Sequence, residues 1–403
     1  MRILIISQYH PPEMGAAATR WSDYARILAD LGHEVFVISE VPNYPSGTIP
    51  KDYIGGNHFK FTRDSQDKYC LLHVPVWTNP RRNTIQRMGF FLSFMFSASY
   101  AALKIRRFDR VIISSPPLFV GIVGILMKWI KRNQVVLDLR DLWPESAVIL
   151  GELNNGVAIY LGKKLEVLVY RTVDKFLFAV PGFKSHLEKF QTRPSSQSYP
   201  LMNGVDQKYF IETGKTSSRR EIEPFTVLYA GNFGLAQNLE IIINAAKELR
   251  QVPIRFLLIG DGARRSDLED QIKSSQLTNI ELRPSVARDA LIGTMRSAHI
   301  GIVPLIDSPL FLNAIPSKLL EYMACGLPCI VSIRGEVEEL VARSGGGVCI
   351  EPENYTALAE TISDLFHNSQ KREKMGKSGR LYVGKFLIKQ NLLMATLGLI
   401  ENY

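Results

Sequence analysis

An α/β protein with two doubly wound, parallel sheets is the fold class that this sequence predicts. Short apolar runs alternate with longer segments of helical periodicity, and the alternation restarts in the second half of the chain. The apolar runs are continuous, which is typical of strands that helices cover on both faces. At 403 residues the chain is too long for one ordinary core. We therefore expect two domains, each built as a parallel sheet between helices.

The first domain is predicted to span residues 1–202. It opens directly on a strand over 2–7, which is followed by a helix over 17–31 that Gly32 ends. Further strands are predicted at 34–39, 111–114 and 135–138.

The second domain is predicted to span residues 203–383 and repeats the pattern. Its predicted strands are 226–229, 254–259, 279–283, 300–304 and 329–333. Helices are predicted between them at 238–250, 264–275 and 288–297. The junction is expected near 203–206, because a polar stretch over 212–224 follows it.

Composition limits the choice of partner. Residues 1–200 contain 25 Lys and Arg against 16 Asp and Glu, whereas residues 201–403 contain 23 of each kind. A basic half indicates an anionic partner such as membrane lipid or a pyrophosphate. No zinc-finger, RRM or helix-turn-helix pattern is present, so nucleic acid is not expected. Four scattered cysteines and the lack of a signal-peptide pattern predict a cytosolic protein with reduced thiols.

The most informative segment is 315–330, where a short helix opens on Pro-Ser-Lys. Ser317 and Lys318 lie at a helix N-terminus, where backbone N–H groups and a cation suit a phosphate. Glu321 lies three residues after Lys318 on the same helical face and can accept hydrogen bonds from a diol such as ribose. The alternative is a surface helix stabilised by an i,i+3 Lys–Glu ion pair.

Glycines follow several predicted strands, at the sheet edge where open α/β folds bind ligands. Gly15 lies in the first loop; Gly231, Asn232 and Gly234 follow the strand at 226–229; Gly260 follows the next one. Such loops let backbone N–H groups approach a phosphate, although Gly15 could also serve only a tight turn. The Gly-x-Gly-x-x-Gly pattern is missing, which argues against a dinucleotide dehydrogenase.

Charged residues crowd the segment after the strand at 135–138. Asp138, Arg140, Asp141 and Glu145 fall within eight residues. Such density suggests either chemistry or an Arg–Asp network that fixes the loop. Arg140 and Glu145, together with Glu13 in the first loop, are candidate contacts for an acceptor substrate.

Residues 88–103 carry no charge and are flanked by arginines and lysines. The run is short for a transmembrane helix. It predicts a helix lying on an anionic membrane surface, with arginines on the head groups and phenylalanines in the acyl boundary. The residues predicted to do this are Arg81, Arg82, Arg87, Phe90, Phe91 and Phe94. The alternative is a buried helix of the first domain.

The segment from Pro316 to Pro328 resembles the donor-binding motif of family 4 retaining glycosyltransferases, which have the GT-B fold. The Asn-Gly-Val-Asp run at 203–206 and the Pro-Pro-x-x-Gly run of the first loop are also similar to that family. Its members usually carry two glutamates eight positions apart, the second of which binds the nucleotide ribose. Glu321 matches the second, and Asn313 stands at the first. Asn313 cannot be a carboxylate nucleophile, but it can hydrogen-bond a sugar hydroxyl.

The run from Asp141 to Ser146 resembles a subgroup often assigned as N-acetyl-L-fucosamine transferases of O-antigen and capsule assembly. Asp141 aligns with a family histidine that contacts the donor sugar, so the resemblance implies that Asp141 orients a sugar or acceptor hydroxyl. Val286 falls where the family holds the nucleobase, and Lys318 would stabilise charge on the leaving phosphate. Residues 384–403 resemble the closing helix that returns to the first domain.

The resemblance implies transfer of an N-acetylated hexose from a UDP-sugar to a lipid-pyrophosphate-linked saccharide, with retention, at the inner face of the plasma membrane. No Asp-x-Asp motif is present, so neither a metal nor another cofactor is expected. The sequence does not predict an oligomeric state. Two alternatives remain open: a sugar-nucleotide 2-epimerase of the same fold, and a non-catalytic scaffold that binds nucleotide sugars.

Overall fold

The computed structural model describes residues 1–401 apart from 14, 44–46, 57–58, 64–67, 80–83, 150, 152, 191–197 and 212–223. The chain divides into two compact units. Unit 1 comprises Met1–Met202 with Leu393–Tyr403, and unit 2 comprises Asn203–Leu392. The chain thus leaves unit 1 after Met202 and returns to it after Leu392, where the predicted passages were after 202 and 383.

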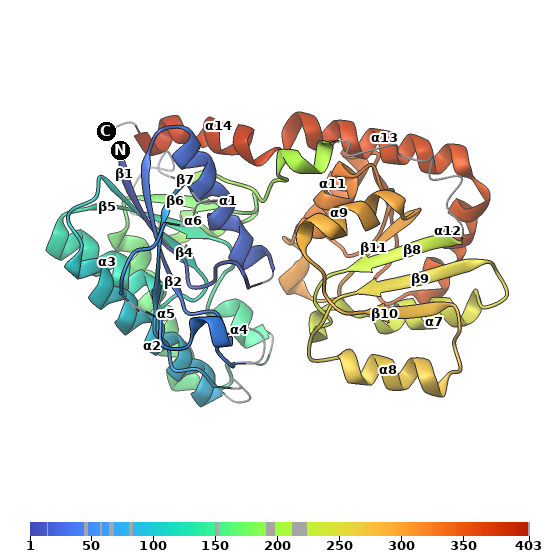
Figure 1. The fold of residues 1–403 in the computed structure, drawn as a ribbon, viewed down its shortest axis with the longest axis horizontal. Coiled ribbons are helices and arrows are strands. Elements are labelled where there is room, and N and C mark those ends of the chain that lie inside the picture. The colour runs from blue at the N-terminus through green and yellow to red at the C-terminus, as the bar shows by residue number, and fades with distance from the viewer. Residues whose placement is uncertain are drawn as a thin grey trace. The chain divides into compact units, whose positions relative to one another are not determined.

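Unit 1 contains one parallel sheet in the order β3-β2-β1-β4-β5-β6-β7 (Figure 1). Its strands are β1 (Arg2–Ile6), β2 (Glu34–Glu40), β3 (Cys70–Val74), β4 (Arg110–Ser115), β5 (Gln134–Leu139), β6 (Lys175–Phe178) and β7 (Ser198–Pro200). Its helices are α1 (Ala16–Asp30), α2 (Thr84–Lys104), α3 (Val120–Lys131), α4 (Glu145–Ile149), α5 (Gly156–Thr172) and α6 (Phe183–Phe190).

Unit 2 contains a second parallel sheet in the order β10-β9-β8-β11-β12-β13. Its strands are β8 (Phe225–Ala230), β9 (Ile254–Ile259), β10 (Ile280–Arg283), β11 (Ile300–Pro304), β12 (Cys329–Ser332) and β13 (Gly347–Cys349). Its helices are α7 (Glu240–Glu248), α8 (Arg265–Ser274), α9 (Arg288–Ser297), α10 (Ser317–Ala324), α11 (Glu336–Ser344), α12 (Tyr355–His367) and α13 (Ser369–Phe386). Helix α14 (Lys389–Glu401) begins in unit 2 and ends in unit 1.

The central strands explain why their sequences are continuously apolar. Ile3, Leu4, Ile5 and Ile6 of β1 have no solvent exposure, so residues pointing to either face of the sheet are covered. The same holds for β8 and β11, whose side chains are buried along their whole length. Each unit therefore has its own core, and the predicted class of two doubly wound parallel sheets is confirmed.

Helix α2 corrects one prediction. Phe90 and Phe94 have no solvent exposure, and Phe94 packs in the core of unit 1, so these two side chains cannot reach a membrane. Phe91 and Arg87 are partly buried. Arg81 and Arg82 lie outside the described residues. The apolar run at 88–103 is thus largely explained by burial, because the helix packs against β2, β3 and α3.

No helix in the described part of the chain is both long enough and apolar enough to cross a membrane.

Candidate functional site

Helix α10 places the two most informative side chains of unit 2. Its Leu319, Leu320 and Tyr322 are fully buried, while Lys318 and Glu321 face the partly exposed side. The backbone N–H of Ala230, the last residue of β8, donates to the Tyr322 hydroxyl at 2.7 Å. The 3.6-residue period therefore fixes one face of α10 in the core and aims the other at the loop that follows β8.

Lys318 is held over Tyr229. Its Nζ donates to the Tyr229 hydroxyl at 2.8 Å and lies 4.0 Å from the centre of that ring. The Tyr229 hydroxyl in turn donates to the Asn232 carbonyl at 2.6 Å. Burial lowers the pKa of Lys318 to about 7, although the charge of Glu321 acts in the opposite direction. This ammonium is therefore poorly stabilised until an anion reaches it.

The i,i+3 ion pair proposed as the alternative for this helix is not formed. Glu321 instead lies 3.3 Å from Arg288, the first residue of α9, measured between Oε1 and Nη2. Arg288 Nε donates to the Tyr209 hydroxyl at 2.8 Å. Tyr209 is fully buried, and burial together with the Glu321 charge raises its pKa. Tyr209, Arg288 and Glu321 thus form one polar cluster beside the Lys318 site.

The glycines after β8 and β9 are required by close contacts. A Cβ on Gly231, whose φ is +150°, would lie 2.8 Å from Lys318 Nζ. A Cβ on Gly260 would lie 1.9 Å from the Gly231 carbonyl oxygen. A Cβ on Gly234 would lie 2.6 Å from Asn232 Nδ2. The structure therefore brings the predicted Gly231, Asn232, Gly234 and Gly260 together with Lys318 at the carboxyl ends of β8 and β9.

The remaining predicted residues of unit 2 lie on neighbouring loops. Ser317 is the first residue of α10 and is partly exposed, and Pro316 before it provides no side-chain cap. Val286 is 36% exposed in the loop between β10 and α9. Asn313 is partly buried in the segment between Phe311 and α10.

Asp138 has a structural role in unit 1. This carboxylate, fully buried, accepts two hydrogen bonds from Arg20, at 3.0 and 2.7 Å. It also accepts from Trp21 Nε1 at 2.7 Å and from the Ser114 hydroxyl at 3.0 Å. An Arg–Asp network therefore does fix this loop, but the arginine comes from α1 and not from the segment itself.

The neighbouring charges have different surroundings. Arg140 donates from Nη2 to the Pro116 carbonyl at 3.0 Å, and Asp141 accepts from the Leu142 backbone N–H at 2.8 Å. Glu145 is exposed at the start of α4. Glu13 is buried and accepts from the Asn43 backbone N–H at 2.8 Å, so it holds a loop. Gly15 has a φ of +114° and open space around it.

The sequence analysis did not predict two residues of the Glu321 cluster, Arg288 and Tyr209. Arg288 lies two positions after Val286, and Tyr209 follows the junction run, where Asp206 caps the short helix Gln207–Phe210. The sequence did contain a signal for Tyr209, because the Asp206 cap predicts a short helix after the junction and Tyr209 is a large side chain in that helix. Nothing local distinguishes Arg288 from the other arginines.

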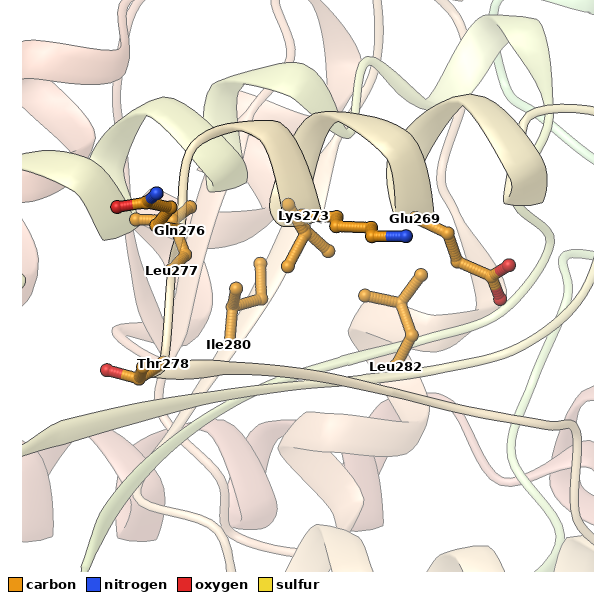
Figure 2. Close-up of a pocket in the computed structure, with 8 residues that line it drawn as sticks. Glu269, Lys273, Gln276, Leu277, Thr278, Ile280 and Leu282 are labelled. Atoms are coloured by element: carbon orange, nitrogen blue, oxygen red, sulfur yellow. The ribbon is translucent and has the colours of Figure 1, made fainter.

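A shallow cavity of about 350 Å³ lies elsewhere in unit 2, between α8 and the edge strand β10. Figure 2 shows Ile280 and Leu282 of the strand facing Lys273 and Glu269 of the helix. It contains none of the residues around Lys318. Within the described residues, no three His, Cys, Asp or Glu side chains come close enough to hold a metal ion.

Comparison with known proteins finds a family model that resembles part of this chain. Residues 211–382, which contain α10 and its surrounding loops, match the model described as "Glycosyl transferases group 1". WcaI of Escherichia coli (strain K12), named as a candidate colanic acid biosynthesis glycosyl transferase, is 24% identical over 412 residues. That alignment covers 98% of this chain and 98% of WcaI.

Solved structures show the fold. The sucrose-phosphate synthase (tll1590) of Thermosynechococcus elongatus superposes with a TM-score of 0.74 at 18% identity, covering 99% of this chain and 98% of that one. Anabaena Alr3699/HepE, solved in complex with UDP-glucose, superposes with a TM-score of 0.72 at 15% identity and covers 99% of both chains. The solved structures therefore show the GT-B fold, and the segment 211–382 is similar to group 1 glycosyltransferases.

Proposed function

We propose that the protein transfers a sugar from a UDP-sugar to an acceptor during assembly of a bacterial surface polysaccharide. The observation that carries this proposal is the joint placement of Lys318 and Glu321 against the loop of Gly231. A diphosphate suits the ammonium and the glycine loop, and the two hydroxyls of a ribose suit the carboxylate one turn later. UDP as the nucleotide is supported by the HepE complex with UDP-glucose, and the surface polysaccharide by the name of WcaI.

The finer substrate assignment follows the resemblance of the 141–146 run. The donor is an N-acetylated hexose such as N-acetyl-L-fucosamine, and the acceptor is a lipid-pyrophosphate-linked saccharide. Asp141 orients the acceptor or sugar hydroxyl, and the configuration at the transferred carbon is retained. With Asn313 where the family has glutamate, no carboxylate nucleophile stands at that position, so Asn313 hydrogen-bonds the donor sugar.

Lys318 acts on the leaving group. Breaking the glycosidic bond places negative charge on the diphosphate, and a nearby ammonium stabilises that charge in the transition state. Losing the ammonium should lower kcat by about 10²-fold or more. Among the described residues the Lys318 side chain makes one hydrogen bond, to the uncharged Tyr229 hydroxyl, so no carboxylate competes with a diphosphate for the ammonium.

The test of the donor site is a thermal-shift comparison of UDP, GDP and NAD on wild type and on Glu321→Ala. A ligand at about 100 times its dissociation constant stabilises by roughly 2.7 kcal/mol, a shift of a degree or two in a chain of this size. We expect a UDP-selective shift that Glu321→Ala loses. A shift with NAD alone, or with no nucleotide at all, would contradict the proposal.

We also propose that unit 1 lies on an anionic membrane, through a face broader than the predicted helix. Helix α3 packs against both α2 and α5. Large apolar side chains stand exposed on all three, among them Phe96 at 67%, Trp129 at 64% and Tyr160 at 60%. The basic residues of these helices are Arg87, Lys104, Lys128, Lys131, Lys163, Lys164 and Arg171. Their single carboxylate, Glu166, is buried.

Exposed apolar side chains and basic residues on three neighbouring helices match the acyl boundary and head groups of an anionic leaflet. Cosedimentation with vesicles measures this. Binding to anionic vesicles should exceed binding to neutral ones and fall in a Trp129→Ala, Tyr160→Ala double variant. Leu381→Ala is the matched control, because Leu381 is 74% exposed but lies on α13 of unit 2. Equal binding by both variants would contradict the assignment.

A further inference from the structure

The carboxyl edge of the sheet in unit 1 holds polar donors that the proposed function does not yet use. The order β3-β2-β1-β4-β5 places β2 and β4 on opposite sides of β1, so the topological switch point lies between β1 and β4. Doubly wound sheets bind ligands at such a point, outside the carboxyl ends of the strands. Ser115 ends β4, and Arg140 follows the end of β5.

Arg140 is a cation whose charge is not balanced in the structure. Asp138, two residues before it on β5, already binds Arg20, so that pair is neutral as a unit. Arg140 forms no ion pair among the described residues, and its one side-chain hydrogen bond goes to the Pro116 carbonyl. Its Nε is buried without a hydrogen-bond partner. Burial lowers the pKa of Arg140, which Asp138 only partly counteracts.

Ser115 supplies a second donor of the same kind. Its hydroxyl is buried and has no hydrogen-bond partner in the structure. It lies next to Arg140, because the Arg140 backbone N–H donates to the Ser115 carbonyl at 3.0 Å and the Arg140 side chain reaches the next carbonyl, of Pro116. Buried polar groups are nearly always paired, so two orphaned donors at one ligand-binding edge indicate a missing acceptor group.

We propose that Ser115 and Arg140 form an oxyanion site that binds a phosphate group of the acceptor substrate, a proposal that rests on the transferase function proposed above. A guanidinium and a hydroxyl both donate to phosphate oxygens, and the guanidinium has no acceptor atom of its own. Arg140 as a whole is partly exposed, so an anion can approach its guanidinium from solvent.

The charges around Arg140 favour a particular ligand. Tyr9, from the loop after β1, and Asp141 both act electrostatically on the guanidinium. A bare anion would be repelled by the Asp141 carboxylate. A phosphorylated sugar avoids this conflict, because it brings an oxyanion to Arg140 and a hydroxyl donor to Asp141. Such a ligand has the chemistry of a lipid-diphosphate saccharide.

The experiment uses the full chain with UDP present in excess, so that the Lys318 site is occupied. Isothermal titration then measures binding of a short-chain prenyl diphosphate, with the matching prenyl alcohol as the ligand control. We expect the diphosphate alone to bind. Arg140→Met should weaken that binding about 10- to 100-fold and Ser115→Ala about two- to tenfold, with the affinity for UDP unchanged in both. Arg140→Lys should fall between wild type and Arg140→Met.

Three outcomes would overturn the inference. The diphosphate could bind all variants equally, or it could compete with UDP, which would place it at Lys318. The third is a loss of UDP affinity in Arg140→Met, which would assign the site to the diphosphate of the donor. Ser115→Ala keeps the test valid should Arg140→Met fail to fold, because the Ser115 hydroxyl makes no hydrogen bond in the structure. Failure of wild type to bind UDP would reject the proposed function, while the prenyl diphosphate titration still reports on Arg140.

Discussion

Nucleotide binding should be coupled to proton uptake by Lys318, and pH is the perturbation that reveals it. Burial lowers the pKa of this ammonium from its usual 10.5 to about 7. The difference corresponds to about 5 kcal/mol against the charged form in the empty site. At pH 8 most of the side chain is therefore neutral before UDP binds, and at pH 9 nearly all of it is.

A bound diphosphate reverses this balance. A phosphate oxygen about 4 Å from the ammonium, at an effective dielectric constant of about 20, favours the charged form by about 4 kcal/mol. This free energy is enough to reverse most of the downward shift of the Lys318 pKa. UDP itself carries its full charge above pH 7. The dissociation constant of UDP should thus rise about tenfold per pH unit between pH 7 and pH 9.

Isothermal titration in two buffers of different ionisation enthalpy measures the dissociation constant of UDP and the number of protons taken up on binding. At pH 8 we expect uptake of close to one proton per UDP bound. Lys318→Arg is the matched control, because a guanidinium stays charged throughout this range and its UDP affinity should not depend on pH. An equal dissociation constant at pH 7 and pH 9 in wild type, with no proton uptake, would refute the reasoning.

Three further predictions test the geometry. Gly231→Ala should weaken UDP binding and lower the melting temperature slightly, because its Cβ meets the movable end of Lys318 at 2.8 Å and its φ of +150° disfavours a side chain; Gly260→Ala, whose Cβ meets a backbone oxygen at 1.9 Å, should lower the melting temperature much more. Tyr209→Phe should reduce the preference for UDP over 2′-deoxy-UDP several-fold, because the Tyr209 hydroxyl holds Arg288 beside Glu321; an unchanged ratio in titration would argue against this role. Asp138→Asn should lower the free energy of unfolding by about 3–5 kcal/mol, because Arg20 loses its counter-charge in a buried site. Urea unfolding followed by tryptophan fluorescence measures this in unit 1, since all four tryptophans lie there.

The central strands could be predicted because strands buried on both faces appear in the sequence as continuous apolar runs. β1, β4, β8 and β9 are apolar runs that both helix layers cover. The strands that were missed lack this signal. β13 is three residues long and only partly buried, and β7 ends on Pro200. β3 carries His73 inside a short apolar stretch, and β6 begins with Lys175 and has only three apolar residues after it. Pairing with a neighbouring strand, and not composition, makes these segments extended.

Helix α2 shows how a correct observation led to a wrong placement of side chains. An uncharged run between basic residues is typical both of a membrane-surface helix and of a helix packed on two sides. Period alone does not separate these cases, because the buried Phe94 and the exposed Phe96 are both apolar. Only the contacts with β2, β3 and α3 decide which phenylalanines face inward.

The cluster around Lys318 and Glu321 could be predicted to the extent that its residues are neighbours along the chain. Ser317, Lys318 and Glu321 share one helix, so their spacing alone placed them on a common face. Arg288 and Tyr209 reach Glu321 from α9 and from the junction, more than thirty and more than a hundred positions away. Such contacts depend on the sheet order, which the sequence does not state.

The separation of Lys318 from Glu321 is what makes the helix useful for binding a diphosphate. A Lys–Glu pair three residues apart on an exposed helix would neutralise itself and stabilise the helix by a few tenths of a kcal/mol. In this structure each partner is drawn away, Lys318 to the Tyr229 hydroxyl and ring, and Glu321 to Arg288. Tyr229 offers the ammonium no negative charge, and burial, which the charge of Glu321 only partly offsets, lowers the pKa of Lys318 to about 7. The binding free energy of a diphosphate therefore includes the compensation of a charge that the fold has left unpaired.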